Sequence, residues 1–370
     1  MEESLPVYIE KKLLTRLSHG FSLEKGDELM NFSAPVSEEA KKLHYDSIVI
    51  DGTSFFCRGY GDHFAQAGVT ALNITVPDPD DDIDGAVEKI ASYYQLIKED
   101  PKLQLIETVD DIFRTKEEGD VGIILAFQNA RPMAYNLAMA EVFHRLGTRV
   151  VILAYNRRNF ASDWSGTDDD TGLSQQGREL IQEMNRLGIV LDLTHLSDRS
   201  SLEAIEISKK PPIFSHSNPR SRVNLARNIT DDQIKKVAAK GGVVGLTVFA
   251  PLNWKGGNVL PTLGDYLDNM EYVIDMAGID HVSIGTDSEA TPGAYPPELR
   301  SRLRTQFSHL VGGYYQTFKD NPEANHLDGF SGMADFPLIT QGLLDRGYDE
   351  ASIRKILGLN LVRVFQEVWQ

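Results

Sequence analysis

Cysteine is almost missing from the chain, and long apolar runs are missing altogether. Cys57 is the single cysteine among 370 residues, which excludes a disulfide within the chain and agrees with a reducing compartment. No stretch approaches the roughly 20 apolar residues that a membrane-spanning helix needs, and residues 1–20 contain no continuous apolar segment like that of a secretory signal. We therefore expect a cytoplasmic protein that does not bind a membrane.

Basic residues are too few to balance the acidic ones. Lysine and arginine number 37 against 54 aspartates and glutamates, which gives a net charge of −17. This charge repels nucleic acid and anionic lipid headgroups, so a small-molecule substrate is expected instead. Part of the excess lies in the run PDPDDDID at 77–84. Like charges in a block stay hydrated, which favours a solvated loop there over the alternative of a divalent-cation site.

The fingerprints of nucleotide binding are also missing. A glycine-rich turn directly after an early strand would indicate a nucleotide fold, but the run KGGVVG at 240–245 ends a helical pattern and enters an apolar one. Those glycines are expected to end a helix. The sequence therefore contains neither a Walker nor a Rossmann motif.

What the sequence does contain is a regular alternation of short β-branched runs and helical segments. In SQQGRELIQEMNRLG, Ser174 is a suitable N-cap and Gly188 a suitable C-cap, and Thr230 and Gln233 have the spacing of a capping box. The expected strands are 47–52, 69–76, 121–127, 149–155, 189–195, 212–216, 243–249 and 281–287. Eight apolar strands that alternate with helices predict an α/β fold, a (β/α)8 barrel of the TIM type.

The domain organisation follows from the same pattern. Residues 1–45 are polar and precede the first apolar run, so we expect an N-terminal extension packed on the barrel. Residues 46–370 then form a single barrel domain. Residues 288–334 have no clear period and are expected to form a long functional loop, either a lid or an interface segment.

In such a barrel the chemistry lies at the C-terminal ends of the strands, because the loops there surround one mouth. Two consecutive expected strands end in histidines, His195 and His216, and the last one ends in Asp287. Neutral imidazoles and a carboxylate suit a divalent metal such as zinc. A buried histidine at one strand end would more often be structural, but two at adjacent strand ends favour a metal site.

Six motifs in order identify a resemblance. They are LSQQGRELIQEMNRLGI, DLTHLSD, IFSHSNPR, RNITDDQIKKVAAKGGVVG, HVSIGTD and IRKILGLNLVRVFQEVW. Together they resemble the membrane (renal) dipeptidase family of zinc hydrolases, over about residues 45–370. The resemblance implies an amidohydrolase-like barrel that holds two zinc ions and cleaves dipeptides. It also implies that His195 and His216 bind the second zinc, that Arg227 holds the substrate carboxylate, and that Asp287 lies close to the first zinc and the substrate amine.

The other half of the family pattern is replaced. The family's first strand ends in Asp-Gly-His-x-Asp, and this chain has Thr53 and Phe55 at the two ligand positions. Gln128 replaces the bridging glutamate, and Tyr155 replaces the histidine that polarises the scissile carbonyl. A divalent ion without anionic or imidazole ligands cannot recover its desolvation cost. We therefore expect one zinc at most.

The function that these residues favour is a metallohydrolase for a dipeptide or another small amide with a free carboxylate. The single ion would lie on His195 and His216, with Asp287, Gln128 or Cys57 as a third ligand. The expected catalytic residues are Asp287, Tyr155 and Gln128, and the expected substrate-binding residues are Arg227, Phe55, Thr53 and Asn156. Cys57 is otherwise expected to be a buried structural residue.

Two other functions fit the same sequence. One is a barrel enzyme of changed chemistry, such as a lyase, an isomerase or a specialised catabolic or biosynthetic enzyme, because one barrel fold supports many reactions. The other is a ligand-binding homologue that has lost catalysis. The family resemblance and the C-terminal FQEVWQ also indicate a homodimer.

Overall fold

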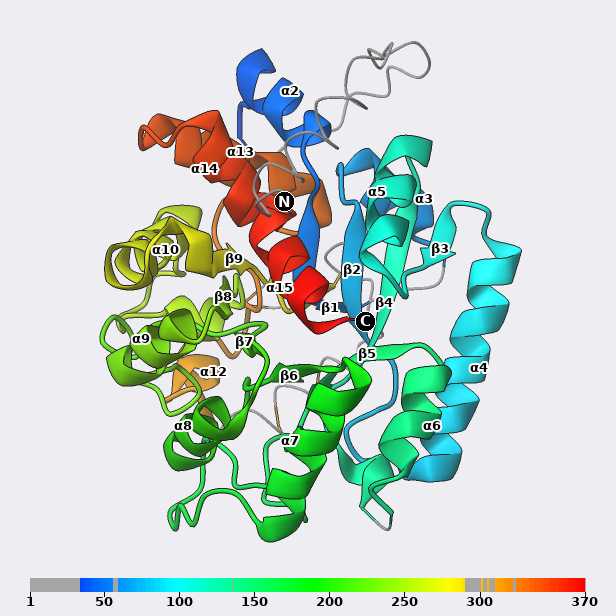
Figure 1. Cartoon of the computed structure of the whole chain (residues 1–370). Coiled ribbons are helices and arrows are strands. Elements are labelled where there is room, and N and C mark those ends of the chain that lie inside the picture. Colours follow the sequence, from blue (N-terminus) through cyan, green and yellow to red (C-terminus); the bar gives the residue numbers. More distant parts are fainter. Residues whose placement is uncertain are drawn as a thin grey trace, which may run out of the picture. The chain divides into compact units, whose positions relative to one another are not determined.

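Parallel strands form the centre of the structure, and helices surround them (Figure 1). The computed structural model describes residues 34–55, 59–134, 136–289, 301, 305, 310–321 and 324–369. The chain divides into two units, residues 1–31 and 32–370, and every described residue belongs to the second. Most of the predicted extension, and Cys57, therefore lie outside the described residues.

The main strands are β1 (Ile50–Phe55), β2 (Ala71–Thr75), β4 (Val121–Phe127), β5 (Thr148–Ile152), β6 (Val190–Asp192), β7 (Ile213–Phe214), β8 (Val243–Leu246) and β9 (Val282–Ile284). Each pairs in parallel with the next. A two-residue strand, β10 (Ser288–Glu289), follows β9 and pairs in parallel with β1. This pairing joins the last strands to the first one. The predicted (β/α)8 barrel is confirmed.

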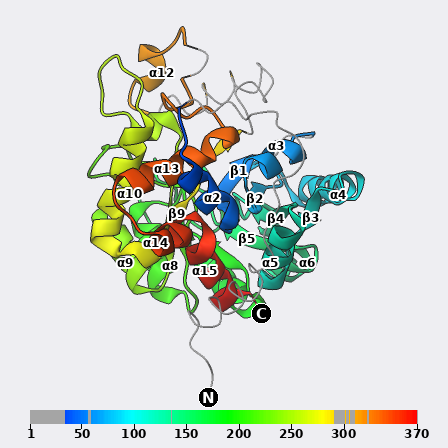
Figure 2. The same cartoon turned by 90° about the horizontal axis from the view of Figure 1, so that it is seen from above.

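The helices that cover the barrel are distributed around it in the second view (Figure 2). They are α2 (Glu38–Asp46), α3 (Gly61–Gln66), α4 (Ile83–Glu99), α5 (Val109–Glu118), α6 (Met139–Arg145), α7 (Gln175–Leu187), α8 (Asp198–Ile207), α9 (Asp231–Ala239), α10 (Leu263–Ala277), α12 (Tyr314–Thr317), α13 (Phe336–Asp345), α14 (Glu350–Arg354) and α15 (Asn360–Val368). No helix in the described part of the chain has the length and apolar content needed to cross a bilayer.

The residues that were predicted to cap two of the helices do cap them. The Ser174 hydroxyl accepts a bond from Gly177 N at the start of α7, and Gly188 ends that helix with φ 80°. Thr230 and Gln233 form the capping box of α9. The short strand β3 (Leu103–Leu105), which pairs with β4, was not predicted, because three residues are too few to show a period.

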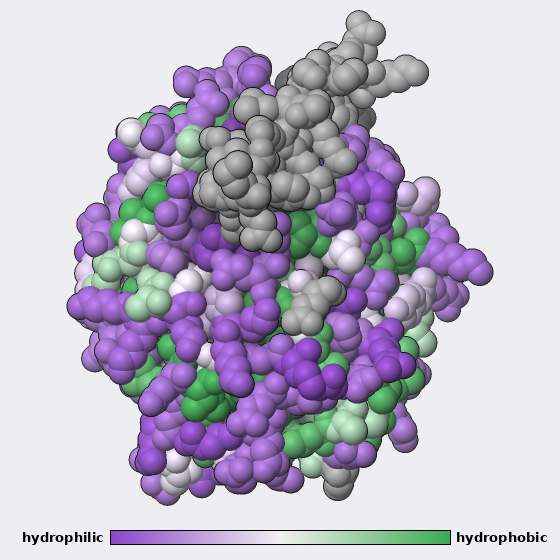
Figure 3. Space-filling view, in the orientation of Figure 1, coloured by the Kyte–Doolittle hydropathy of each residue, from purple (hydrophilic) through white to green (hydrophobic). Residues whose placement is uncertain are grey.

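Apolar surface is scattered on the face shown in Figure 3, where hydrophilic residues predominate. Among the described residues, the large hydrophobic side chains that are exposed are Val87, Tyr94, Val142 and Val259. A few exposed apolar residues are ordinary on a protein surface. The homodimer stays a prediction.

His44, at the end of α2, is a buried link between three segments. Its Nδ1 lies 2.8 Å from the Thr340 hydroxyl of α13, and its Nε2 lies 2.9 Å from the carbonyl oxygen of Ala67. The carbonyl can only accept, so Nε2 carries the proton and Thr340 donates to Nδ1. Burial lowers the pKa of His44 to about 4. The ring is therefore neutral in the folded protein at neutral pH.

We predict that His44 makes the fold sensitive to acid. The unfolded chain takes up a proton on this ring near pH 6.5, whereas the folded protein does so only near pH 4. Its contribution to the free energy of unfolding is thus full above pH 6.5 and falls by about 1–3 kcal/mol as pH decreases to 4. Urea unfolding of the wild type and His44→Gln at several pH values checks this. The wild type should lose more stability than the variant over that range, and the exposed His63→Gln should behave like the wild type. Equal pH slopes for wild type and His44→Gln would contradict the role of His44.

Candidate functional site

His195 and His216 meet at the C-terminal ends of β6 and β7, as predicted. Their Nε2 atoms lie 3.1 Å apart, and both side chains are buried. Burial is the main cause that lowers the pKa of each ring well below its ordinary value, and the charge of Arg227 adds to it. Both rings are therefore neutral at pH 7 and present lone pairs.

The backbone beneath His216 is fixed by close packing. A Cβ on Gly245 of β8 or on Gly285, just after β9, would overlap the carbonyl oxygen of Ser215. A Cβ on Gly52 of β1 would lie 2.7 Å from the same oxygen. Only glycine permits three strands to approach one carbonyl group so closely. The position of His216 is thus set by the barrel itself.

Arg227 reaches the histidine pair from the loop after β7. Its Nη2 lies 3.0 Å from the carbonyl oxygen of His216 and 3.3 Å from Nε2 of His195, and its Nη1 donates to the Ser217 hydroxyl at 3.1 Å. The side chain is buried. A guanidinium stays charged even where burial lowers its pKa, so the pocket keeps one fixed positive charge.

Tyr155 and Asn156 follow β5 and contact His195 from the other side. The rings of Tyr155 and His195 are 4.4 Å apart between centroids. The Asn156 Oδ1 lies 2.8 Å from Nδ1 of His195. Burial, together with the charge of Asp287, raises the pKa of Tyr155, so its phenol stays protonated and can donate a hydrogen bond.

Asp287 belongs to the same site and interacts through its charge with Arg227 and Tyr155. Burial raises the pKa of its carboxyl to about 7, and the charge of Arg227 opposes that increase. Its backbone N–H donates to the carbonyl oxygen of Thr53 at 2.8 Å, which ties the end of the last strand to β1. A carboxyl with a pKa near neutrality suits proton transfer at physiological pH.

Three residues of the site have strained backbone conformations. Among the described residues, the non-glycine residues with positive φ are Asn156 (49°), His195 (69°) and Asp287 (55°). Each follows a different strand, and each is a predicted site residue. Left-handed backbone costs free energy for a residue with a side chain, and it is concentrated at functional sites.

The first-strand residues lie in two environments. The Thr53 hydroxyl points into the barrel, 3.0 Å from the Ser215 hydroxyl and 2.6 Å from the carbonyl oxygen of Gly52. Phe55 is half-buried at the end of β1, where it pairs with Glu289 of β10.

Gln128, which follows β4, donates through Nε2 to the Thr75 hydroxyl at 2.7 Å. The expected contacts of Thr53, Phe55 and Gln128 with the substrate stay predictions.

Sequence reasoning missed the hydroxyl group and the carboxylate that support this site from below. The Ser215 hydroxyl lies 2.7 Å from Nδ1 of His216, and its position directly before a predicted ligand is the signal that could have identified it. Asp51 is buried and accepts from the backbone N–H and the hydroxyl of Thr286, at 2.7 and 2.6 Å. Burial raises the pKa of Asp51 to about 7. These bonds hold β1 against the end of β9.

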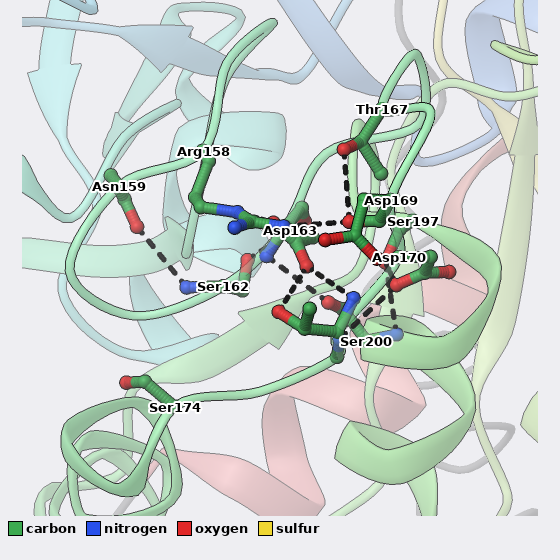
Figure 4. Close-up of polar contacts among 12 residues, drawn as sticks. Arg158, Asn159, Ser162, Asp163, Thr167, Asp169, Asp170, Ser174, Ser197 and Ser200 are labelled. Atoms are coloured by element: carbon green, nitrogen blue, oxygen red, sulfur yellow. Dashed lines mark hydrogen bonds and ion pairs between the residues drawn. The ribbon is translucent and has the colours of Figure 1, made fainter.

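A second missed feature is the loop 153–174, which carries Tyr155 and Asn156. Asp163 is buried in it, is paired with Arg158 (Figure 4), and accepts from the backbone N–H and the hydroxyl of Thr171 at 2.6 and 2.7 Å. Asp170 accepts from the Ser197 hydroxyl at 2.6 Å, which fastens the loop to the start of α8. The loop also returns to the site, because Ser165 N donates to the carbonyl oxygen of His195 at 2.8 Å.

The histidine pair has the spacing of two ligands on one metal ion. Two Zn–N bonds in tetrahedral geometry place the nitrogens about 3.3 Å apart, close to the 3.1 Å between the two Nε2 atoms. Thr53, Phe55 and Gln128, which the resemblance implies stand at the positions of the first ion's ligands, have neither a carboxylate nor an imidazole. Within the described ranges, no group of three or more histidine, cysteine, aspartate or glutamate side chains could hold a metal.

Comparison with known proteins identifies relatives of this chain. The model of the membrane dipeptidase family (Peptidase family M19) matches residues 37–303 and 318–370. The chain is 25% identical over 269 residues to dipeptidase tcpJ of Claviceps purpurea, a match that covers 72% of this chain and 56% of that protein. It is 33% identical over 195 residues to an uncharacterized dipeptidase of Schizosaccharomyces pombe, covering 51% and 47%. The chain thus spans about half the length of these curated relatives.

Solved structures show the same relation. An amidohydrolase from Pseudomonas aeruginosa superposes with a TM-score of 0.78 at 33% identity, covering 89% of this chain and 99% of that one. A metallopeptidase from Rhodobacter sphaeroides, liganded with a phosphinate mimic of the dipeptide L-Ala-D-Ala, shares the fold with a TM-score of 0.70 at 20% identity, covering 87% and 100%. With its barrel, its histidine pair and a family match over most of its length, this chain belongs to the membrane dipeptidase family.

Proposed function

We propose that the protein hydrolyses a dipeptide or another small amide with a free carboxylate, with at most one metal ion on His195 and His216. The observation that carries the proposal is the convergence of the two neutral imidazoles, Arg227 and Asp287 at one mouth of the barrel. A bound ion would supply a polarised water molecule there. The relatives that are named dipeptidases support the amide substrate.

Arg227 is the proposed anchor for the substrate carboxylate. Its Nη1 and Nη2 bond to Ser217, His216 and His195, and the planar guanidinium has five N–H groups in total, so donors remain for a ligand. Burial removes competing water, which strengthens a charge-assisted hydrogen bond. This contact would fix which end of the substrate enters the site.

Asp287 and Tyr155 are the proposed acid–base pair. With a pKa of about 7, the Asp287 carboxyl is partly ionised at neutral pH and can accept a proton from the attacking water. Tyr155 keeps its proton because its pKa is raised, and its phenol can donate to the oxyanion that develops on the scissile carbonyl. Gln128, a neutral donor at the end of β4, is a second candidate for that bond.

The substrate class is tested with matched pairs of ligands. The protein should hydrolyse members of a panel of dipeptides and N-acyl amino acids, and a C-terminally amidated version of the best substrate should lose at least about tenfold in kcat/KM, because Arg227 then loses its anionic partner. Arg227→Lys should raise KM for the free acid, since an ammonium group cannot reproduce the planar donor geometry of the guanidinium. The exposed pair member Arg199→Lys is the control. No turnover of any member of the panel would contradict the proposed function.

The acid–base role predicts a pH profile. Because Asp287 acts as a base, kcat/KM should increase as pH rises through about 7 and level off above it. Asp287→Asn should lower the plateau by about 10²-fold or more and remove this ionisation from the profile. Steady-state rates between pH 5 and 9 measure both effects. A wild-type profile that is flat through pH 7, or an unchanged profile in the variant, would rule out Asp287 as the base.

A further inference from the structure

Arg227 belongs to the loop 217–229, which joins β7 to α9. The two ends of this loop are bonded to each other. The backbone N–H of Arg220 donates to the carbonyl oxygen of Ile229 at 2.8 Å, and the N–H of Ile229 donates to that of Asn218 at 2.9 Å. The loop is therefore closed at its base, and the contacts within it decide where Arg227 lies.

The Arg220 side chain bonds to the backbone on both sides of Arg227. Its Nη2 donates to the carbonyl oxygen of Ala226 at 3.1 Å, and its Nε donates to that of Asn228 at 2.8 Å. The first carbonyl group belongs to the peptide that joins Ala226 to Arg227, and the second to the residue that follows Arg227. These two bonds restrict the backbone from which the Arg227 side chain extends.

Asp198 holds the Arg220 side chain in this position. Its two carboxylate oxygens accept from Nη1 and Nη2 of Arg220 at 2.6 and 2.7 Å. Four of the five N–H groups of the guanidinium are thus bonded. An exposed ion pair of two flexible side chains contributes little, whereas a bidentate pair fixes its partners in one geometry.

The same pair connects two segments of the site. Asp198 is the first residue of α8 and follows His195 by three positions. Its bonds to Arg220 therefore join the segment after β6, which carries His195, to the loop that carries Arg227. The position of the guanidinium relative to the histidines depends on this connection.

The opposite side of the loop is held by Asn228. This side chain is fully buried, and its Nδ2 donates to the carbonyl oxygens of Val223 and Leu252 at 2.9 and 3.2 Å. Leu252 lies in the short helical turn after β8. The Arg220 side chain is 22% exposed, so of the two contacts it is the one that can be removed without opening a cavity in the core.

Arg227 needs a fixed backbone in order to recognise a carboxylate. Its Nη1 and Nη2 donate to the Ser217 hydroxyl and to the carbonyl oxygen of His216, at 3.1 and 3.0 Å. A contact between a guanidinium and a carboxylate depends on the direction of the N–H groups as well as on distance. The surrounding residues must therefore hold such a group to within about 0.5 Å.

We propose that Arg220 and Asp198 are positioning residues for the recognition of a substrate carboxylate, because they hold the backbone beside Arg227 and so orient its guanidinium. The inference rests on the proposed role of Arg227 as the carboxylate anchor. Arg220 and Asp198 act through that anchor, since their side chains bond to the loop and to each other. Removal of Arg220 should weaken the binding of free carboxylates and leave the chemistry at the histidine pair in place.

The first test measures the loop itself and needs no ligand. Hydrogen–deuterium exchange, followed by mass spectrometry, compares the wild type with Arg220→Gln. The backbone amides of residues 220–229 should exchange faster in the variant, whereas those of β8 should exchange as in the wild type. Arg222→Gln is the matched control, because it removes an arginine of the same loop that pairs with Asp268 of α10. Equal exchange of the loop in the wild type and Arg220→Gln would overturn the inference.

The second test measures steady-state rates with the best substrate from the panel of dipeptides and N-acyl amino acids. Arg220→Gln should raise KM for the free acid at least about tenfold and leave kcat unchanged, because a displaced guanidinium loses the direction of its bonds. The C-terminally amidated substrate should show little change in kcat/KM, and Arg222→Gln should behave like the wild type with both. A fall in kcat with KM unchanged, or an equal loss for acid and amide, would contradict a role in orienting Arg227.

Asp198→Asn is the second variant. The amide keeps one oxygen acceptor and loses the charge, so it should raise KM for the free acid by less than Arg220→Gln does. The double variant should raise KM no more than Arg220→Gln alone, because the two residues act as one unit. Fully additive effects would contradict this. Thermal unfolding shows which variants are folded, and if Arg220→Gln does not fold, Asp198→Asn decides the test.

The inference and the proposed function fail in different ways. Turnover of free acids with a KM that Arg220→Gln leaves unchanged overturns the inference alone. If the wild type turns over no member of the panel, the proposed function fails. Hydrogen exchange, and the affinity for the same free acids by isothermal titration, then still decide whether Arg220 holds Arg227 in place for a carboxylate.

Discussion

The close approach of three strands to the carbonyl group of Ser215 is the constraint on which the site depends. A Cβ on Gly52, Gly245 or Gly285 would come within 2.7 Å of this oxygen or closer, so the backbone around His216 can pack this closely only with glycine at these positions. His195 meets His216 at 3.1 Å between their Nε2 atoms and has a left-handed backbone conformation. The strain is compensated by the loop 153–174, which bonds to both the backbone and the ring of His195. The packing of the barrel strands and the geometry of the site therefore depend on each other.

The departures from the family pattern form a consistent set. In the alignment that the resemblance implies, the residues at the first ion's positions have no charge and no imidazole, whereas the histidine pair, Arg227 and Asp287 are all present. Thr53 has a different role from a ligand, since its hydroxyl points to Ser215 beneath His216. The histidine pair is thus present, and Thr53 belongs to its hydrogen-bonded support.

The barrel and the main site residues could be predicted from the sequence because they depend on local signals. Apolar runs alternate with capped helices, and the histidines directly follow such runs. The supporting contacts could not be predicted, because they join residues far apart in the chain. Asp51 bonds to Thr286 across 235 positions, and the Ser215 carbonyl meets glycines from three strands. The buried Asp163 was missed because its partners lie within an irregular loop that has no period to read.

The central claim is that the pair of imidazoles holds one divalent ion at most. Elemental analysis of protein equilibrated with zinc and then freed of excess metal tests it most directly. The account predicts no more than one zinc per chain, and none in the double variant His195→Ala/His216→Ala. Two zinc ions per wild-type chain, or zinc retained by the double variant, would contradict it.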